Sequence, residues 1–308
     1  MFHSTCRFAV LLLLIGAGSA CQTGTGNNLT ATPAVVQAPA PQSPPIALPN
    51  RMGSLKFAVL GDFGTGSRQQ YELADQMSKL HARFPFELVI TVGDNIYGGE
   101  RAEDFRKKFE IPYKALLDSG VKFYASLGNH DARNQRFYKL FNMDGKLYYS
   151  FKAPEQSVRF FALESTYPDA EQIGWVGKEL KGANDEWKIA FFHHPLYSSG
   201  ERHGSDTRLR ATFEPLFVDG NVSVVFTGHD HFYERIKPQK GIPYFVVGSG
   251  GQLRSGNIDS TTRLTAKGFD TDLTFLAAEI FEDSLTFNAL SRTGQIVDSG
   301  VITRRQPQ

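Results

Sequence analysis

The chain carries the stretch LVITVGDNIY at residues 88–97, in which an apolar run leads directly into a glycine, a carboxylate, an amide and a phenol. A short apolar run closed by a turn residue is typical of a buried β-strand. The same design recurs in FAVLGDFG at 57–64, KFYASLGNHD at 122–131, IAFFHHP at 189–195 and VVFTGHDH at 224–231. Each run therefore predicts a strand whose carboxyl end is followed by polar side chains.

Amphipathic stretches separate these runs, as in an α/β fold. We expect helices near residues 68–83, 101–118, 170–181 and 207–218. The C-terminal part predicts a strand at 244–247 and a hairpin meander over 274–290.

In open α/β sheets, the groups that bind ligands gather at the carboxyl ends of the strands. A glycine after a strand is expected to make the sharp turn that lifts the next side chain into that crevice. The sequence therefore predicts one cluster of carboxylate, imidazole, amide and phenol groups. Six of the eight histidines lie in these segments or just after one: His130, His193, His194, His203, His229 and His231.

The composition is that of a soluble globular protein, with 41% hydrophobic and 21% charged residues. The 33 basic and 32 acidic side chains nearly balance, which gives no indication of a nucleic-acid-binding patch. Cys6 and Cys21 are the two cysteines, so neither a disulfide framework nor a cysteine-based zinc site is expected in the body of the protein. Nitrogen and oxygen ligands without thiolate suit iron, zinc or manganese.

The ordered segments resemble those of the calcineurin-like metallophosphoesterases, and among them the purple acid phosphatases of the small tartrate-resistant type. The resemblance covers roughly residues 55–235 and continues in GIPYFVVGSGG at 241–251. Tyr97, three positions after Asp94, is the residue that points to the purple acid phosphatases. The family implies a four-layer α/β/β/α sandwich of two packed mixed sheets, which is the fold we expect.

By this resemblance the site binds two metal ions, Fe(III) and a divalent iron, zinc or manganese ion. The ligands of the first ion would be Asp62, Asp94, Tyr97 and His231, and those of the second Asp94, Asn129, His193 and His229. Such ions bind phosphoryl oxygens and lower the pKa of the attacking water. The expected activity is therefore the hydrolysis of small phosphate monoesters, as in an acid phosphatase.

Two outer histidines are expected to act on the substrate. By resemblance, His130 reaches the substrate phosphate, which the metal ligand Asn129 is also expected to bind, and His203 contacts the substrate or protonates the leaving alkoxide. Tartrate-resistant relatives usually carry an acidic residue before this last histidine, whereas this chain has Arg202. We include Arg202 among the substrate-binding residues because its charge favours an anionic substrate.

Other residues near the site receive lesser roles, and other functions stay open. We expect His194 to be structural, Asp131 to orient His130, and His81 to be a surface residue. One alternative function is that of a phosphodiesterase or nucleotidase of the same fold. Another is a metal-binding surface lipoprotein without turnover. The sequence gives no indication of the oligomeric state.

The first 21 residues are expected to be an export signal, with Arg7 before a short apolar run and small residues before Cys21. The run is too short to span a bilayer. The ending GSAC resembles a bacterial lipobox, so we expect a periplasmic or cell-envelope lipoprotein attached to the membrane through lipidated Cys21. Plain cleavage after Ala20, giving a secreted protein, is the alternative.

A composition change marks the next boundary. Residues 22–52 are rich in Pro, Ala and Thr and predict a disordered tether, because such a segment buries too little apolar surface to fold. Residues 53–308 are expected to form the metallophosphoesterase catalytic domain.

Overall fold

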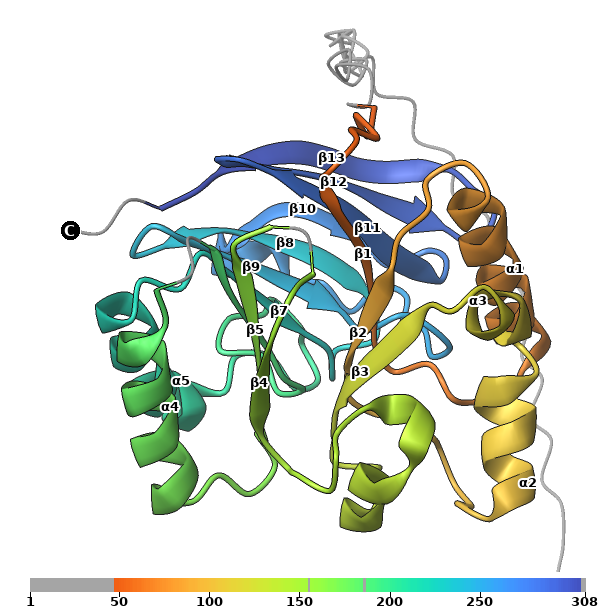
Figure 1. Cartoon of the computed structure of the whole chain (residues 1–308), viewed down its shortest axis with the longest axis horizontal. Coiled ribbons are helices and arrows are strands. Elements are labelled where there is room, and N and C mark those ends of the chain that lie inside the picture. Colours follow the sequence, from red (N-terminus) through yellow and green to blue (C-terminus); the bar gives the residue numbers. More distant parts are fainter. Residues whose placement is uncertain (1–46, 155, 185–186, 306–308) are drawn as a thin grey trace, which may run out of the picture. The chain divides into compact units, whose positions relative to one another are not determined.

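The computed structural model describes residues 47–154, 156–184 and 187–305. The expected export signal and most of the expected tether lie outside these residues. The described chain forms two sheets (Figure 1). The first sheet has six strands in the order β13-β12-β11-β1-β2-β3, and the second has seven in the order β10-β8-β9-β7-β6-β5-β4.

Both sheets are mixed. The strands of the first are β1 (Leu55–Leu60), β2 (Leu88–Val92), β3 (Lys122–Ser126), β11 (Thr274–Phe281), β12 (Ser284–Ser291) and β13 (Ile296–Thr303). The strands of the second are β4 (Tyr149–Lys152), β5 (Val158–Ala162), β6 (Trp187–Phe191), β7 (Val224–Thr227), β8 (Tyr233–Gln239), β9 (Ile242–Val247) and β10 (Thr265–Phe269). Strands β1, β2 and β3 run parallel, as do β5, β6 and β7, so the carboxyl ends within each group share one edge.

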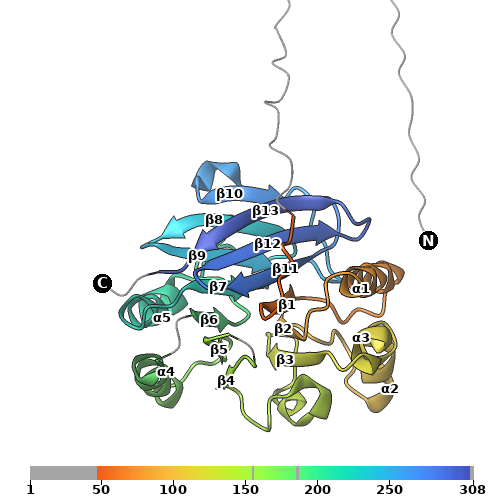
Figure 2. The ribbon, with the colours of Figure 1, turned by 45° about the horizontal axis from the view of Figure 1, so that its top comes forward.

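Helices cover the outer face of each sheet. The first sheet carries α1 (Arg68–His81), α2 (Ala102–Phe105) and α3 (Lys114–Asp118), and the second carries α4 (Ala170–Gly182) and α5 (Thr207–Asp219). Figure 2 shows the two sheets between these helix layers, so the predicted four-layer sandwich is confirmed. Short 3₁₀ helices span Arg133–Phe137, Lys139–Phe141 and Ser260–Thr262. Among the described residues, the helices are all too short or too polar to cross a bilayer.

The core between the sheets is built from aromatic rings. Phe57 of the first sheet meets Phe160 and Phe226 of the second edge to face, with ring centroids 5.4 and 6.2 Å apart. Phe245 of the second sheet meets Phe287 of the first at 5.1 Å in the same geometry. Edge-to-face contact suits the charge distribution of aromatic rings, and large rings bury much apolar area. The abundant phenylalanines thus hold the two sheets face to face.

The helix predicted over residues 101–118 is wrong as a single element. The chain instead forms α2, a π-helical turn at Arg106–Glu110, and then α3. A π-helix leaves carbonyls without their usual intrahelical partners. Here Tyr71 Oη donates to the carbonyl of Lys107 at 2.6 Å, and Gln70 Nε2 donates to that of Lys108 at 2.6 Å. Contacts from α1 therefore stabilise a break that the local pattern does not reveal.

The described chain contacts the domain before the expected boundary at residue 53. The backbone N–H groups of Asn50 and Arg51 donate to the two carboxylate oxygens of Glu279 on β11, at 2.5 and 2.6 Å. Leu48 packs against the core. This end segment therefore lies against the first sheet, next to the amino end of β1.

Candidate metal centre

The candidate site lies where the carboxyl ends of strands from both sheets meet. Asp62 and Asp94 follow β1 and β2 of the first sheet, whereas His193 and His229 follow β6 and β7 of the second. Hydrogen bonds join the sheets at this edge, and two of them involve the histidines. The N–H of His229 donates to Asp62 Oδ2 at 3.0 Å, and His193 Nδ1–H donates to the carbonyl of Val92 at 3.0 Å.

The backbone is strained at three of the expected ligands. Asp62, Asp94 and His229 adopt left-handed conformations, with φ of 54°, 50° and 71°. Residues other than glycine rarely adopt this region, and such strain gathers at functional sites. The sharp turns at β1 and β7 are thus made by the aspartate and the histidine rather than by the preceding glycines, contrary to expectation.

Two of the glycines that follow strands, Gly128 after β3 and Gly228 after β7, provide room for carboxylates instead. A Cβ at Gly228 would lie 2.3 Å from Asp62 Oδ2, and a Cβ at Gly128 would lie 2.2 Å from Asp94 Oδ1. Any side chain at either position would displace a carboxylate of the site. Both residues are therefore needed for the close approach of neighbouring loops.

The first predicted ligand set lies together around one phenol. Tyr97 Oη is 3.2 Å from Asp62 Oδ1, 3.0 Å from Asp94 Oδ2 and 3.3 Å from His231 Nε2. A phenol has one hydrogen, which cannot satisfy both carboxylates at once. Burial, and then the negative charge of Asp94, raise the pKa of Asp62. Burial and the two carboxylates also raise the pKa of Tyr97. A cation among these atoms would relieve both the repulsion and the shortage of donors.

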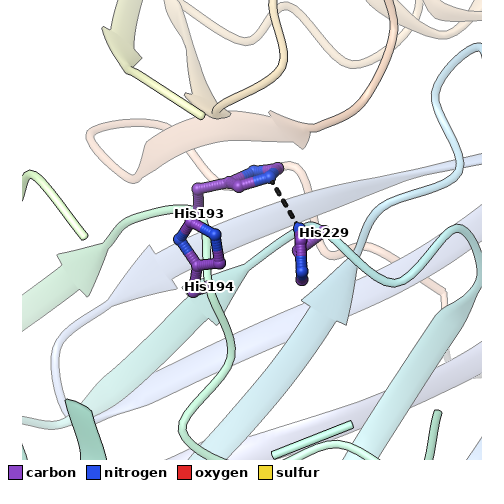
Figure 3. A group of neighbouring side chains, drawn as sticks. All are labelled: His193, His194 and His229. Atoms are coloured by element: carbon purple, nitrogen blue, oxygen red, sulfur yellow. Dashed lines mark hydrogen bonds between the residues drawn. The ribbon is translucent and has the colours of Figure 1, made fainter. Parts of the chain in front are cut away.

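The second set lies around the imidazole of His193. His193 Nε2 is 3.0 Å from Asn129 Oδ1, 3.1 Å from His229 Nδ1 and 3.5 Å from Asp94 Oδ1. The carbonyl of Val92 accepts a hydrogen bond from His193 Nδ1–H. In the neutral ring, Nε2 therefore has a free lone pair. Figure 3 shows His193 and His229 facing each other across this contact.

The donor atoms of the two sets fit a pair of cations. Asp94 contributes one carboxylate oxygen to each set, and such sharing is what a bridging ligand requires. Donor atoms of Asp62, Asp94 and His193 lie within 4.8 Å of one another, as do those of His193, His194 and His229. All seven predicted ligands are thus brought into two adjoining groups of oxygen and nitrogen donors, which suit iron, zinc or manganese.

The residues expected to act on the substrate lie beside these groups. The exposed ring of His130 is 5.0 Å from that of Tyr97, and the exposed ring of His203 is 4.2 Å from that of His229. Arg202 and His203 line a cavity of about 340 Å³ that reaches His229. Burial, then the charges of Arg254 and Arg202, lower the pKa of His203.

Comparison with known proteins agrees with this geometry. The family model of the calcineurin-like phosphoesterases matches residues 55–233. The chain belongs to the calcineurin-like phosphoesterases. It is 26% identical to purple acid phosphatase 17 of Arabidopsis thaliana, over 68% of this chain and 72% of the relative. It is 25% identical to human tartrate-resistant acid phosphatase type 5, over 64% of this chain and 73% of the relative.

A solved structure shares the fold at lower sequence identity. GAP50, described as the anchor in the inner membrane complex of Plasmodium, has a TM-score of 0.73 and 20% identity, covering 82% of this chain and 90% of that one. The two relatives compared in sequence are a purple acid phosphatase and a tartrate-resistant acid phosphatase. The chain is thus a metal-dependent phosphoester hydrolase, and its family implies a binuclear metal site and phosphate-ester substrates.

The structure corrects the role expected for Asp131 in this phosphoesterase. Asp131 is half-buried, and its carboxylate accepts hydrogen bonds from the backbone of Asn95, Ile96 and Gly128 and from the side chains of Asn95 and Gln135, and not from His130. Burial, and then the charge of Asp94, raise the pKa of Asp131 to about 7. A carboxylate removed from water needs several hydrogen-bond donors, and those of Asp131 come from the loops that follow β2 and β3. Asp131 therefore joins these two loops.

Two further residues were missed by sequence reasoning. Arg254 donates its backbone N–H to the carbonyl of His231 at 2.9 Å, and its Nη1 is buried without a hydrogen-bond partner among the described residues. Burial and the charge of Arg254 lower the pKa of His231 to about 4. Asp230 accepts from Ser198 Oγ at 2.5 Å and from the N–H of Gly204 at 3.2 Å, which fastens the loop that carries His203.

The sequence signal for these two residues differs. Asp230 stands between two expected ligands in GHDH, so its position was visible. Arg254 follows an irregular loop and had no such signal. His81, expected at the surface, is half-buried with its ring 4.9 Å from that of Phe86.

Proposed function

We propose that this phosphoesterase is an exported acid phosphatase that hydrolyses phosphate monoesters at a pair of metal ions held by the seven residues of the two donor sets. The observation that carries the proposal is the sharing of Asp94 between the sets, with Tyr97 in the first. A phenolate ligand favours a trivalent ion, so Fe(III) with a divalent iron, zinc or manganese ion is the combination that we propose.

Metal ions at this position would bind the phosphoryl oxygens and lower the pKa of the attacking water. The protein's own groups neutralise part of the charge of the metal ions and position the substrate. Asp62, Asp94 and an ionised Tyr97 carry three negative charges against the five positive charges of a trivalent and a divalent ion. The positive remainder favours an anionic ester, and phosphoryl transfer depends mainly on such positioning and neutralisation.

The two outer histidines supply the remaining groups. His130 is exposed beside Tyr97, where it can bind the phosphate from the side of the first donor set. His203 is exposed beside His229, where its imidazole can give a proton to the leaving oxygen. Arg202, on the wall of the same cavity, would attract the negative charge of the substrate.

Export and lipidation at Cys21 belong to this proposal. The sequence supports both through the signal-like residues 1–21. Replacing Cys21 by alanine should move the protein from the membrane pellet to the soluble fraction in the native host. A variant that still sediments with membranes would contradict attachment through this residue.

The functional proposal is tested by metal analysis of the purified protein together with rates on an aryl phosphate and its diester. We expect two metal ions per chain and faster hydrolysis of the monoester. A faster diester would favour the phosphodiesterase alternative. Two bound metals without any hydrolysis would favour a non-catalytic metal-binding protein.

A further inference from the structure

His194 lies on the wall of the substrate cavity, although the sequence suggested only a structural role for it. The cavity that contains Arg202 and His203 also includes His194 and His229. The ring of His194 is 4.4 Å from that of His229 and 4.9 Å from that of His193 (Figure 3). His194 is half-buried, so it can meet a molecule bound in the cavity.

A serine determines which nitrogen of His194 carries the hydrogen. Ser165 Oγ lies 3.0 Å from His194 Nδ1 and also accepts the backbone N–H of His194 at 3.0 Å. These two contacts are the hydrogen bonds that Ser165 Oγ makes among the described residues. Ser165 is 3% exposed, so its hydroxyl hydrogen needs a partner inside the protein.

The balance of donors and acceptors then leaves one arrangement. If Nδ1–H donated to the serine, the buried hydroxyl hydrogen would have no acceptor, which is costly. If the hydroxyl donates to Nδ1, every group is satisfied. The ring is then neutral, with its hydrogen on Nε2, since each nitrogen of a neutral imidazole is either a donor or an acceptor.

An Nε2–H group cannot bind a metal ion, because its in-plane orbital holds the hydrogen and its lone pair belongs to the aromatic ring. His194 therefore differs from His193, whose Nδ1–H is held by the carbonyl of Val92 and whose Nε2 is free to act as a ligand. Two adjacent histidines are thus held in opposite tautomers by their neighbours. The first is suited to a metal, and the second to an oxygen acceptor.

We propose that His194 is a substrate-contacting residue, whose Nε2–H, fixed by Ser165, donates a hydrogen bond to an oxygen of the phosphate ester in the cavity. This inference rests on the proposed function for the identity of the ligand. It assigns to His194 a role in binding the substrate and not the metal, although one of its nitrogen atoms lies close to donor atoms of His193 and His229.

The experiment compares three variants of the metal-loaded protein with a matched control. His194→Gln places an amide donor near the position of Nε2, His194→Asn places one near Nδ1, and His194→Ala has none. His81→Gln repeats the first change at a half-buried histidine outside the site. Metal content, inorganic phosphate binding by calorimetry and the Michaelis constant for an aryl phosphate are measured for each.

We expect every variant to keep the metal content of the native protein. His194→Ala should have a lower melting temperature, because the buried hydroxyl of Ser165 loses its acceptor. His194→Ala should bind phosphate roughly 10- to 100-fold more weakly, the range for a lost hydrogen bond to a charged group. His194→Gln should retain more binding than His194→Asn, and His81→Gln should match the native protein. Nitrogen NMR of the zinc-loaded protein should find the hydrogen of the His194 ring on Nε2.

Other results would overturn the assignment. Loss of a metal in His194→Ala would make His194 a ligand, and unchanged phosphate binding would leave it structural, as the sequence suggested. A hydrogen found on Nδ1 would remove the role of Ser165. Phosphate binding and the NMR measurement need no turnover, so an inactive native protein would refute the phosphatase proposal without deciding the role of His194.

Discussion

Replacing Gly228 by alanine tests whether the close approach of the two sheets builds the metal centre. The added Cβ would lie 2.3 Å from Asp62 Oδ2 and 3.0 Å from the carbonyl oxygen of Val92. Real Cβ atoms essentially never come within 3.0 Å of such atoms, so the carboxylate and the backbone at residue 228 must move apart by at least the difference, 0.7 Å. Its hydrogen bond to the N–H of His229 would be stretched at the same time.

The displacement has a measurable consequence because reacting groups tolerate little misplacement. A shift of about 1 Å can cost on the order of 10²-fold in rate. We therefore expect Gly228→Ala to lose at least one metal ion and to hydrolyse an aryl phosphate about 10²-fold more slowly. Metal analysis and initial rates are the assays, with circular dichroism to show that the fold is kept.

A second glycine provides the control. Gly174 lies inside α4, and a Cβ there would meet no atom within 4 Å. Gly174→Ala should keep both metals and full activity, and should raise stability by up to about 1 kcal/mol through helix propensity. If Gly228→Ala bound two metals and turned over like Gly174→Ala, the argument from the shared edge of the sheets would be refuted.

Four further predictions follow from the same geometry. Asp94→Ala should lose metal and nearly all turnover because Asp94 serves both donor sets, and unchanged metal content would contradict the assignment. A Tyr97 phenolate bound to ferric iron should give the iron-loaded protein a visible colour through charge transfer. Tyr97→Phe should abolish this colour while iron stays bound, and a coloured variant would exclude a Tyr97 phenolate as its source. We expect the buried Nη1 of Arg254, which has no partner among the described residues, to donate to a bound phosphate. Arg254→Met should then raise the Michaelis constant for an aryl phosphate about tenfold and Arg254→Lys less, as expected for a charge-assisted hydrogen bond, and equal constants would remove Arg254 from substrate binding. A chelator should lower the melting temperature, since metal at a thousand times its dissociation constant stabilises the fold by about 4 kcal/mol; an unchanged melting temperature would mean that the fold does not depend on metal.

The strands and the residues that follow them could be predicted because both are local. An apolar run of β-forming residues predicts a strand. The residues that follow the run lie at the carboxyl end of that strand, and in a parallel arrangement these ends share one edge of the sheet. Asp62, Asp94 and His229 could be found in this way. Their assignment to one metal or the other came from family resemblance, since strand order cannot be read from a single run.

Contacts between distant segments could not be predicted. The break at Arg106–Glu110 depends on Gln70 and Tyr71, more than 30 residues earlier. The tautomer of His194 depends on Ser165, at a separation of 29 residues. No periodicity encodes such pairs, because each partner satisfies the rules of its own segment.

The glycines show a second limit of prediction from the sequence. Their position after a strand was visible, but their effect lies in the space that they leave for a carboxylate from another loop. Gly128 and Gly228 act on Asp94 and Asp62 respectively, which belong to different segments of the chain. The local sequence suggests that a glycine is needed at these positions for its conformational freedom. The fold shows that it is needed because a side chain would collide with the carboxylate.

The fastening of Asn50 and Arg51 to Glu279 has a practical consequence for immobilising the enzyme. The chain enters the first sheet at the amino end of β1, whereas the metal centre lies beyond its carboxyl end, about 20 Å away for a strand of this length. A bead, electrode or fusion partner joined upstream of Leu48 would hold the domain by the end remote from the cavity. Mechanical load on such a linker would reach Glu279 on β11 before it reached any metal ligand, so an immobilised enzyme should keep its catalytic face open and its geometry undisturbed.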